Sequence, residues 1–263
     1  MPKDLKTFSK EELVKNMKAI SGKWHKGILP GEDGNAGRTL ENLLGIKENN
    51  FKIPDYGEFQ VKSQKITTKS LITIFHKEPN PPASVPKVLD SMGWFVERKN
   101  KFRFSSTTYS NKYTVRGFTI DWDDNKIYFK FDRSKVKKTR KDQSKSYETL
   151  GHWLNDIEKR VPHYSSILPL HYSKKEIIDH FILNYNKVLF TVCESKKIND
   201  VENFNYQEAY ILQDFSLDNF NRNFDENKII FDFNVSTGHN HGVGIRIKKN
   251  ILYSLYLTKE KIL

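Results

Sequence analysis

Three polar residues between positions 55 and 62 have the types and the spacing that phosphodiester hydrolysis requires. Asp55 falls in the turn-like segment Ile53-Pro54-Asp55-Tyr56-Gly57, and Gln60 and Lys62 follow on a segment of alternating polar and apolar residues. Carboxylates bind Mg²⁺, which polarises a phosphate and lowers the pKa of the attacking water. A neighbouring lysine offsets negative charge that develops in the transition state. The spacing indicates a metal-dependent hydrolytic site, although any edge strand with a polar face would show the same pattern.

The elements around these residues are predicted from local patterns. Period-two alternation over residues 58–62 predicts a half-buried strand, with Glu58, Gln60 and Lys62 on one face and the apolar residues of the segment in the core. A short helix through residues 39–44, closed by Gly45, carries Glu41. The capping box Ser9-Lys10-Glu11-Glu12 predicts an earlier helix.

The rest of the chain mixes strand and helix patterns. We expect an apolar strand over 70–76, further strands at 112–122, 126–132, 187–194, 208–213, 229–235 and 243–247, and helices ending at Gly93 and covering 147–160. The predicted fold class is α/β, a mixed sheet with flanking helices. A basic run crowds six cations into nine positions: Arg133, Lys135, Lys137, Lys138, Arg140 and Lys141. It is either a solvated loop or a segment that lies along phosphates.

Composition narrows the function classes. The 263 residues include 44 Lys and Arg against 32 Asp and Glu, so the net charge of +12 favours a polyanionic partner, with nucleic acid the leading case. No apolar stretch approaches the ~18 residues of a membrane span, so no membrane partner is expected. Met1-Pro2-Lys3-Asp4 lacks the apolar core of a signal peptide, and Cys193 is the one cysteine, which excludes an intramolecular disulfide. These features predict a cytoplasmic protein.

Several ordered blocks of the sequence resemble the MvaI/BcnI group of type II restriction endonucleases, which are relatives of the mismatch-repair nickase MutH. The blocks with this resemblance are Ser9–Val14, Asp33–Gly37, Leu40–Asn50, Asp55–Lys62, Lys69–Lys77, Glu208-Ala209-Tyr210 and His239–Ile247. They make up about a third of the chain and span nearly all of it. Ordered blocks at matching spacing are far more specific than one three-residue motif.

The resemblance implies a single bilobed nuclease domain over residues 1–263 with the MutH-like PD-(D/E)xK fold. Its catalytic lobe would centre on 1–95, and its DNA-recognition lobe would come mainly from 96–263. The implied activity is that of a restriction-modification hydrolase, a monomer that cleaves double-stranded DNA at a specific site with Mg²⁺. By position, Glu41 is the acid of the early helix, Asp55 the main metal ligand and Lys62 the catalytic lysine. Gln60 stands where the family has its second acid.

Gln60 departs from the family pattern in a way that matters physically. A carboxamide oxygen is neutral, so the metal site loses one negative charge and Lys62 loses a counter-charge. Three explanations are open: an engineered substitution that impairs cleavage, a natural variant that binds metal through its amide oxygen, or a transfer of the acid's role to Glu58. We favour the first, because relatives carry a glutamate at the position of Glu58 in addition to the catalytic one.

A second group of residues is predicted to contact DNA. His239 and His241 flank Asn240 in a glycine-bounded loop, and the spacing alone fits plain loop residues or metal ligands. The resemblance implies instead that this loop reads bases, with His241 and Arg246 donating to purine N7 and guanine O6. It also places His76 at the central base pair, while Gly244 stands where a second histidine is expected.

The implied target is a short C/G-rich site with two C·G pairs on each side of a centre. Within the basic run, Lys137, Lys138 and Arg140 are the predicted phosphate contacts. Two other functions fit the same residues. One is a MutH-like strand-nicking repair nuclease, which would nick a plasmid rather than linearise it. The other is a non-catalytic, sequence-specific DNA-binding protein that Gln60 has silenced.

Overall fold

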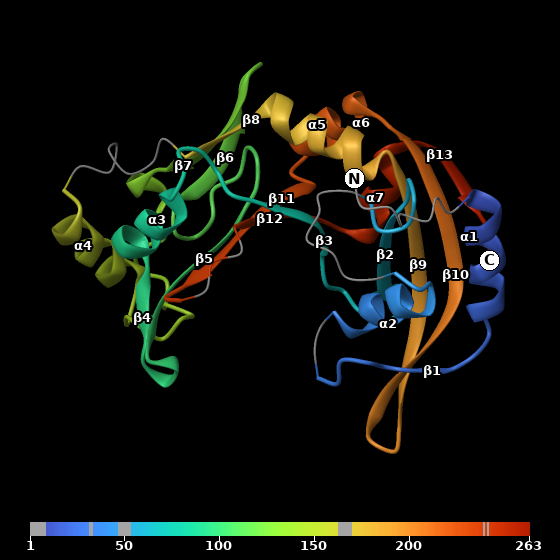
Figure 1. Ribbon diagram of the computed structural model, residues 1–263. Helices are drawn as coiled ribbons and strands as arrows, with labels where there is room; N and C mark the ends of the chain where they lie inside the picture. The colour runs from blue at the N-terminus through green and yellow to red at the C-terminus, as the bar shows by residue number, and fades with distance from the viewer. Residues whose placement is uncertain (1–8, 32–33, 47–53, 163–169, 239, 241) are drawn as a thin grey trace. The chain divides into compact units, whose positions relative to one another are not determined.

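The computed structural model of the chain describes residues 9–31, 34–46, 54–162, 170–238, 240 and 242–263 (Figure 1). The chain divides into two compact units. Unit 1 comprises residues 1–70, 178–219 and 252–263, and unit 2 comprises 71–177 and 220–251. A catalytic lobe centred on 1–95 and a recognition lobe mainly from 96–263 stay a prediction, and the sheet that carries Gln60 and Lys62 also includes later parts of the chain.

Unit 1 contains a five-stranded sheet in the order β1-β10-β9-β2, with β13 also paired to β10. Its strands are β1 (His25–Lys26), β2 (Gln60–Lys65), β9 (Lys187–Ile198), β10 (Val201–Phe215) and β13 (Tyr256–Lys261). β2 runs parallel to β9, and the other pairs are antiparallel. β9 lies between β2 and β10, which explains why all six residues of Val188–Cys193 are buried and five of them are apolar.

Two helices cover the core of unit 1. In α1 (Lys10–Ile20), Ser9 is the N-cap, accepting a hydrogen bond from the Glu12 backbone as the capping box predicts. α2 (Asn35–Leu43) begins four residues earlier than the predicted helix and lies beside β2 (Figure 1). Both helices bury apolar side chains against β2, β9 and β10: Leu13, Met17, Ile20, Ala36 and Leu40. α2 is therefore held where Glu41 can face the start of β2.

Unit 2 contains two antiparallel sheets. The larger has the order β3-β12-β11-β5-β4, and the smaller has the order β6-β7-β8. Their strands are β3 (Ile72–Lys77), β4 (Trp94–Val96), β5 (Lys101–Thr108), β6 (Phe118–Trp122), β7 (Lys126–Phe131), β8 (His171–Ser173), β11 (Ile229–Ser236) and β12 (Val243–Ile247). The ring of Phe104 packs edge-on against Phe118, Phe129 and Phe233, so aromatic residues from both sheets share one core.

The helices of unit 2 are α3 (Ser84–Met92) and α4 (Leu150–Arg160), which contact each other. Three further helices, α5 (Lys174–Tyr185), α6 (Leu217–Asp225) and α7 (Lys249–Ser254), each contain a boundary between the units. Strands and helices thus form a mixed α/β fold, as the sequence predicts. The predicted strand over 112–122 is shorter, because only its end forms β6. No helix of the described residues is long and apolar enough to span a membrane.

Candidate active site and DNA-reading face

A tight turn before β2 positions Asp55. Tyr56 and Phe59 exchange backbone hydrogen bonds of 2.9 and 2.8 Å across this turn. Both of their rings are fully buried, and Asn16 donates to the Tyr56 hydroxyl. Because two buried aromatic anchors fix the turn, Asp55 has a defined place next to the first residues of β2.

The carboxylate of Asp55 is bound by β2 itself. Its Oδ2 accepts a 3.0 Å hydrogen bond from the Val61 backbone N–H and a second bond from Gln60 Nε2. Gln60 is only 9% exposed, so its amide has little access to water. The residue at the position of the expected acid therefore contacts Asp55 directly and presents a hydrogen-bond donor to it rather than a second negative charge.

Glu41 and Lys62 lie within electrostatic reach of Asp55. Burial raises the pKa of Glu41 above its ordinary value, and the negative charge of Asp55 raises it further, while Arg38 and Lys62 act in the opposite direction. Burial likewise raises the pKa of Asp55, opposed by the Val61 hydrogen bond and by Lys62. The structure thus brings together all four predicted residues of this site, Glu41, Asp55, Gln60 and Lys62.

Two further residues complete the surroundings of this site: Arg38, which the sequence offers as an ion-pair partner of Glu41, and Tyr185, which it does not single out. Arg38 donates to Glu41 over 3.3 Å from the same face of α2. The ammonium of Lys62 lies 5.5 Å from the centroid of the Tyr185 ring, a cation–π distance. Burial raises the pKa of the Tyr185 phenol, and Lys62 opposes that rise. Tyr185 ends α5, in a part of the sequence with no clear pattern, so no local signal could have found it.

Glu58 does not share the face that period-two alternation predicts. The strand begins at Gln60, and Glu58 lies in the turn before it, where its carboxylate pairs with Lys187 at 2.5 Å. This placement removes the geometric basis for assigning the role of the missing acid to Glu58. The physical reason is that the tight turn from Tyr56 to Phe59 interrupts the extended backbone.

The donor set of this site fits a hydrated divalent cation. It offers two carboxylates, Asp55 and Glu41, and Mg²⁺ is commonly held by one or two carboxylates with water and phosphate oxygens completing its coordination. Burial is the main reason why the pKa of both carboxyl groups is raised, so a cation bound beside them would offset the cost of ionising them there. Among the described residues no three His, Cys, Asp or Glu side chains cluster, so a cage made entirely of protein ligands is not formed there.

In unit 2, a row of residues crosses the larger sheet at one level. The backbone register aligns His76 of β3 with Gly244 of β12, Gly244 with Asp232 of β11, and Asp232 with Thr107 of β5. A Cβ atom at Gly244 would meet His76 Nε2 at 3.3 Å and Arg246 Cδ at 3.6 Å. The side chains of His76 and Arg246 therefore both lie over Gly244, on the same face of the sheet.

Arg246 is fixed on this face by an acid that the sequence did not suggest. Its Nη1 donates to Asp232 Oδ2 over 2.5 Å, and Thr107 donates to the other oxygen of Asp232 over 2.8 Å. The predicted base-reading residues His239 and His241 lie outside the described residues. No local sequence signal marked Asp232, because its pairing with Arg246 depends on the register of β11 and β12, which aligns Ile230 with Arg246.

The basic run is ordered rather than a loose loop. Its start forms a short 3-10 turn, η2 (Arg133–Lys135), and Val136 is buried. The backbone carbonyls of Lys138 and Arg140 accept hydrogen bonds from Gly151 and Leu150 at the start of α4, each 2.9 Å. The side chains of Lys137, Lys138 and Arg140 remain exposed. The segment therefore presents three cations on a fixed backbone in unit 2.

Comparisons with known proteins give related structures and a family for the whole chain. The chain matches a solved structure described as a restriction endonuclease MvaI–cognate DNA substrate complex, with a TM-score of 0.75 at 18% identity, over 96% of this chain and 98% of that one. Restriction endonuclease MvaI in the absence of DNA also matches, with a TM-score of 0.48 at 18% identity over 95% and 98% of the two chains. A comparison with curated proteins found no significant match. The MvaI/BcnI restriction endonuclease family matches residues 14–256. The chain therefore belongs to this family of site-specific deoxyribonucleases.

Proposed function

We propose that the chain is a type II restriction endonuclease that cleaves double-stranded DNA at a short C/G-rich site with Mg²⁺. The observation that carries this proposal is the meeting of Asp55, Glu41 and Lys62 at the start of β2, with both carboxyl pKa values raised. The DNA complex of a structural neighbour and the net charge of +12 support duplex DNA as the substrate. The proposal includes a monomer that acts in the cytoplasm.

Each residue of the site has a separate role in this proposal. Asp55 and Glu41 hold the cation, which when bound supplies polarisation of the phosphate and a lower pKa for the attacking water. Lys62 orients the nucleophile and offsets the charge that develops on the phosphate, and the Tyr185 ring keeps its ammonium in place. Gln60 keeps Asp55 oriented but adds no charge, so it weakens the hold on the cation.

Recognition is assigned to the polar face of the larger sheet in unit 2. Arg246 donates to guanine, and its pair with Asp232 fixes the guanidinium in one orientation. His76 lies over Gly244 and reads the central base pair. His239 and His241 add base contacts, while Lys137, Lys138 and Arg140 contact phosphates. The proposed target keeps two C·G pairs on each side of the centre.

The decisive experiment compares the chain with its Gln60→Glu variant. The variant restores a negative charge beside Asp55, so we expect it to cleave plasmid DNA at least tenfold faster with Mg²⁺, about 1.4 kcal/mol of barrier. Mg²⁺ should also raise the melting temperature of the variant more than that of the wild type, because the metal then neutralises an additional buried carboxylate. Mapping the ends of the products gives the recognition site and the cut position.

Gln207→Glu is the control, since it adds the same charge to unit 1 at an exposed position of β10 and not on β2. It should give no gain in cleavage. Equal rates for wild type and Gln60→Glu would contradict a catalytic role for this position. Nicked circles in place of linear DNA would favour a MutH-like nickase. If both proteins bind DNA specifically but neither cleaves it with Mg²⁺ or Mn²⁺, a silenced DNA-binding protein is favoured. The Gln60–Asp55 hydrogen bond is compatible with this alternative.

A further inference from the structure

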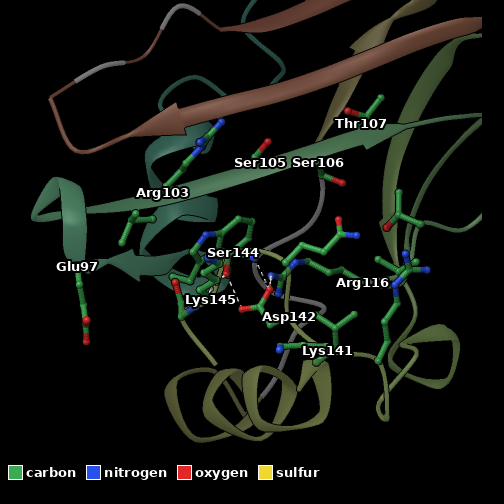
Figure 2. A pocket seen from close by; sticks show the side chains of 18 of the residues that line it. Glu97, Arg103, Ser105, Ser106, Thr107, Arg116, Lys141, Asp142, Ser144 and Lys145 are labelled. Carbon is green, nitrogen blue, oxygen red and sulfur yellow. Dashed lines mark hydrogen bonds and ion pairs between the residues drawn. The ribbon is translucent and has the colours of Figure 1, made fainter. Parts of the chain in front are cut away.

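Unit 2 contains a cavity of about 770 Å³. Of the residues that line it, Arg140 alone has been given a role in the proposed function above. One wall is strand β5, and the other is the segment from Arg140 to Ser146 that precedes α4 (Figure 2). We call it the β5 groove. Its lining combines cations and hydroxyl groups: Arg98, Arg103, Arg116, Arg140, Lys141, Lys145, Ser105, Ser106, Thr107, Thr114, Ser144 and Ser146. Only two acids, Glu97 and Asp142, line it.

A buried ion pair holds the floor of the β5 groove. The guanidinium of Arg116 lies between the rings of Trp94 and Trp153, with centroid distances of 4.1 and 4.6 Å, and donates to Asp142 over 2.5 Å. Asp142 is 2% exposed and also accepts bonds from the backbone N–H groups of Ser144 and Tyr147. Asp142 therefore neutralises Arg116 and fixes the loop, and it offers no countercharge to the other cations.

The remaining cations of the groove face solvent without an acid. Arg98, Lys141 and Lys145 are exposed and form no ion pair with any part of the chain that the structure describes. Arg103 donates to the neutral amide of Asn234 over 3.1 Å. After Arg116 and Asp142 cancel, five positive charges and the single acid Glu97 remain around one cavity. Several cationic and hydroxyl donors with a single acid among them are the chemistry that binds phosphate groups.

The groove adjoins the proposed base-reading face through a direct contact. Thr107 lines the groove, and its hydroxyl donates to Asp232, the acid that holds Arg246. Figure 2 shows Thr107, Ser106, Ser105 and Arg103 in succession along β5, so the groove follows this strand away from Thr107. A DNA strand whose base contacts Arg246 would have backbone phosphates within reach of this end of the groove.

We propose that the β5 groove is a phosphate-binding site that holds the DNA backbone next to the bases contacted by Arg246. That the bound molecule is DNA rests on the proposed function. That the groove binds phosphate groups rests on the residues of the groove alone. Arg98, Lys141 and Lys145 make the charged contacts, while the hydroxyl groups of β5 and the loop donate neutral hydrogen bonds. Such contacts add affinity and orientation without reading sequence.

The test uses the full chain with Arg98 and Lys141 both replaced by Gln, and duplex DNA binding measured by fluorescence anisotropy over a series of salt concentrations without Mg²⁺. Losing two phosphate contacts should make the slope of log K against log salt shallower by about 2, since each contact contributes about 0.9. Lys99→Gln with Lys159→Gln is the matched control, because both lysines are exposed in unit 2 and neither lines the groove. A similar change in both double variants would overturn the proposal.

A second, single-residue variant tests the groove with less risk of disturbing its local structure. Lys145 has a φ of 62°, a conformation that Asn tolerates well, so Lys145→Asn removes a charge without strain. We expect it to reduce the slope by about 1. An unchanged slope with Lys145→Asn, in a variant that melts at the wild-type temperature, would also count against the groove as a backbone site.

Inorganic phosphate and ATP distinguish the two sources of a phosphate group. If ATP raises the melting temperature of the wild type but not of Arg98→Gln/Lys141→Gln, and the DNA slopes match the control, the groove takes a free nucleotide and the DNA assignment is wrong. If the wild type binds no duplex at any salt concentration, the nuclease proposal fails separately. In that case, binding of phosphate or ATP by the wild type but not by the variant would still support the phosphate site. If the wild type binds neither phosphate nor ATP, the phosphate site is overturned as well.

Discussion

The burial of Asp55 and Glu41 beside β2 makes the stability of the protein depend on pH. Burial raises the pKa of both Asp55 and Glu41, so each prefers its protonated form in the folded state more than in the unfolded chain. Their contribution to stability is therefore complete below the unfolded-state pKa values and is lost as pH rises through the folded-state values. The cost of ionisation comes mainly from holding the charged form of each carboxyl group in a buried position, and a bound cation would offset that cost.

Asp55→Asn tests this account at one residue. The amide oxygen can still accept the Val61 N–H, but the charge is gone, so cleavage and the Mg²⁺-dependent rise in melting temperature should both disappear. The metal-free melting temperature at neutral pH should instead rise by about 2–4 °C, which corresponds to about 1 kcal/mol. This gain should shrink as the pH is lowered toward the ordinary pKa of an aspartate. Calorimetry at several pH values measures it, and a constant difference across pH would refute the electrostatic cause.

Gly244 sets how His76 and Arg246 share one face of the sheet. Because a Cβ atom there would lie 3.3 Å from His76 Nε2, Gly244→Ala would push the exposed imidazole aside by a few tenths of an ångström. The backbone of a strand accepts alanine, so stability should change by less than about 1 kcal/mol. We expect altered relative cleavage rates among plasmids that differ at the centre of the site. Unchanged ratios would separate His76 from base recognition.

The sequence revealed those site residues whose chemistry follows from local spacing. Asp55, Gln60 and Lys62 lie within eight positions, and Glu41 follows from the resemblance to the family. Asp232 and Tyr185 meet their partners only in the folded chain. Asp232 pairs with Arg246 on the next strand, and Tyr185 contacts Lys62, which is more than a hundred positions away. Asp232 and Arg246 are 14 positions apart, but their pairing depends on the register of two strands, and Tyr185 comes from a distant helix, so local spacing assigned neither.

Among the elements, the basic run is the one about which the structure adds most, because it shows hydrogen bonds between the backbone of the run and the start of α4. Fixed cations can meet fixed phosphates with little loss of conformational entropy. Replacing Lys137, Lys138 and Arg140 together by Gln should make the slope of log K against log salt shallower by up to about 3 and weaken binding to all sequences alike. Titrations at several salt concentrations with cognate and unrelated duplexes measure both effects. A loss confined to the cognate duplex would point to base contacts instead.

Elements with a start signal or a clear period were predicted, and elements without one were missed. Ser9 caps α1, and Gly93 ends α3 at the residue that the sequence indicates. By contrast, α5 carries apolar residues on its exposed side as well, including Ile182 and Leu183, which obscures the helical period. The hairpin strands β9 and β10 are longer than predicted, because their polar outer ends pair with each other through backbone hydrogen bonds that the side-chain pattern does not report.

At the scale of the whole molecule, neither unit is a continuous stretch of chain. The sheet of unit 1 needs β2 together with β9, β10 and β13, and the larger sheet of unit 2 needs β3 and β5 together with β11 and β12. A fragment of residues 1–177 would keep two strands of the first sheet and lose its centre. We therefore expect this fragment to lack a cooperative thermal transition by circular dichroism, whereas the full chain shows one. A sharp transition in the fragment would show that one unit folds without the later segments.

The interleaving of the two units also limits how a gene for such an enzyme can change its target. A single crossover between two related genes would exchange part of the reading face together with part of the hydrolytic sheet, because residues 178–219 of unit 1 separate the two stretches of unit 2. New target sites would therefore arise by point substitutions at scattered codons, such as those for residues 76, 232, 244 and 246. Under the proposed assignment of roles, the cutting machinery and the choice of site are therefore inherited together.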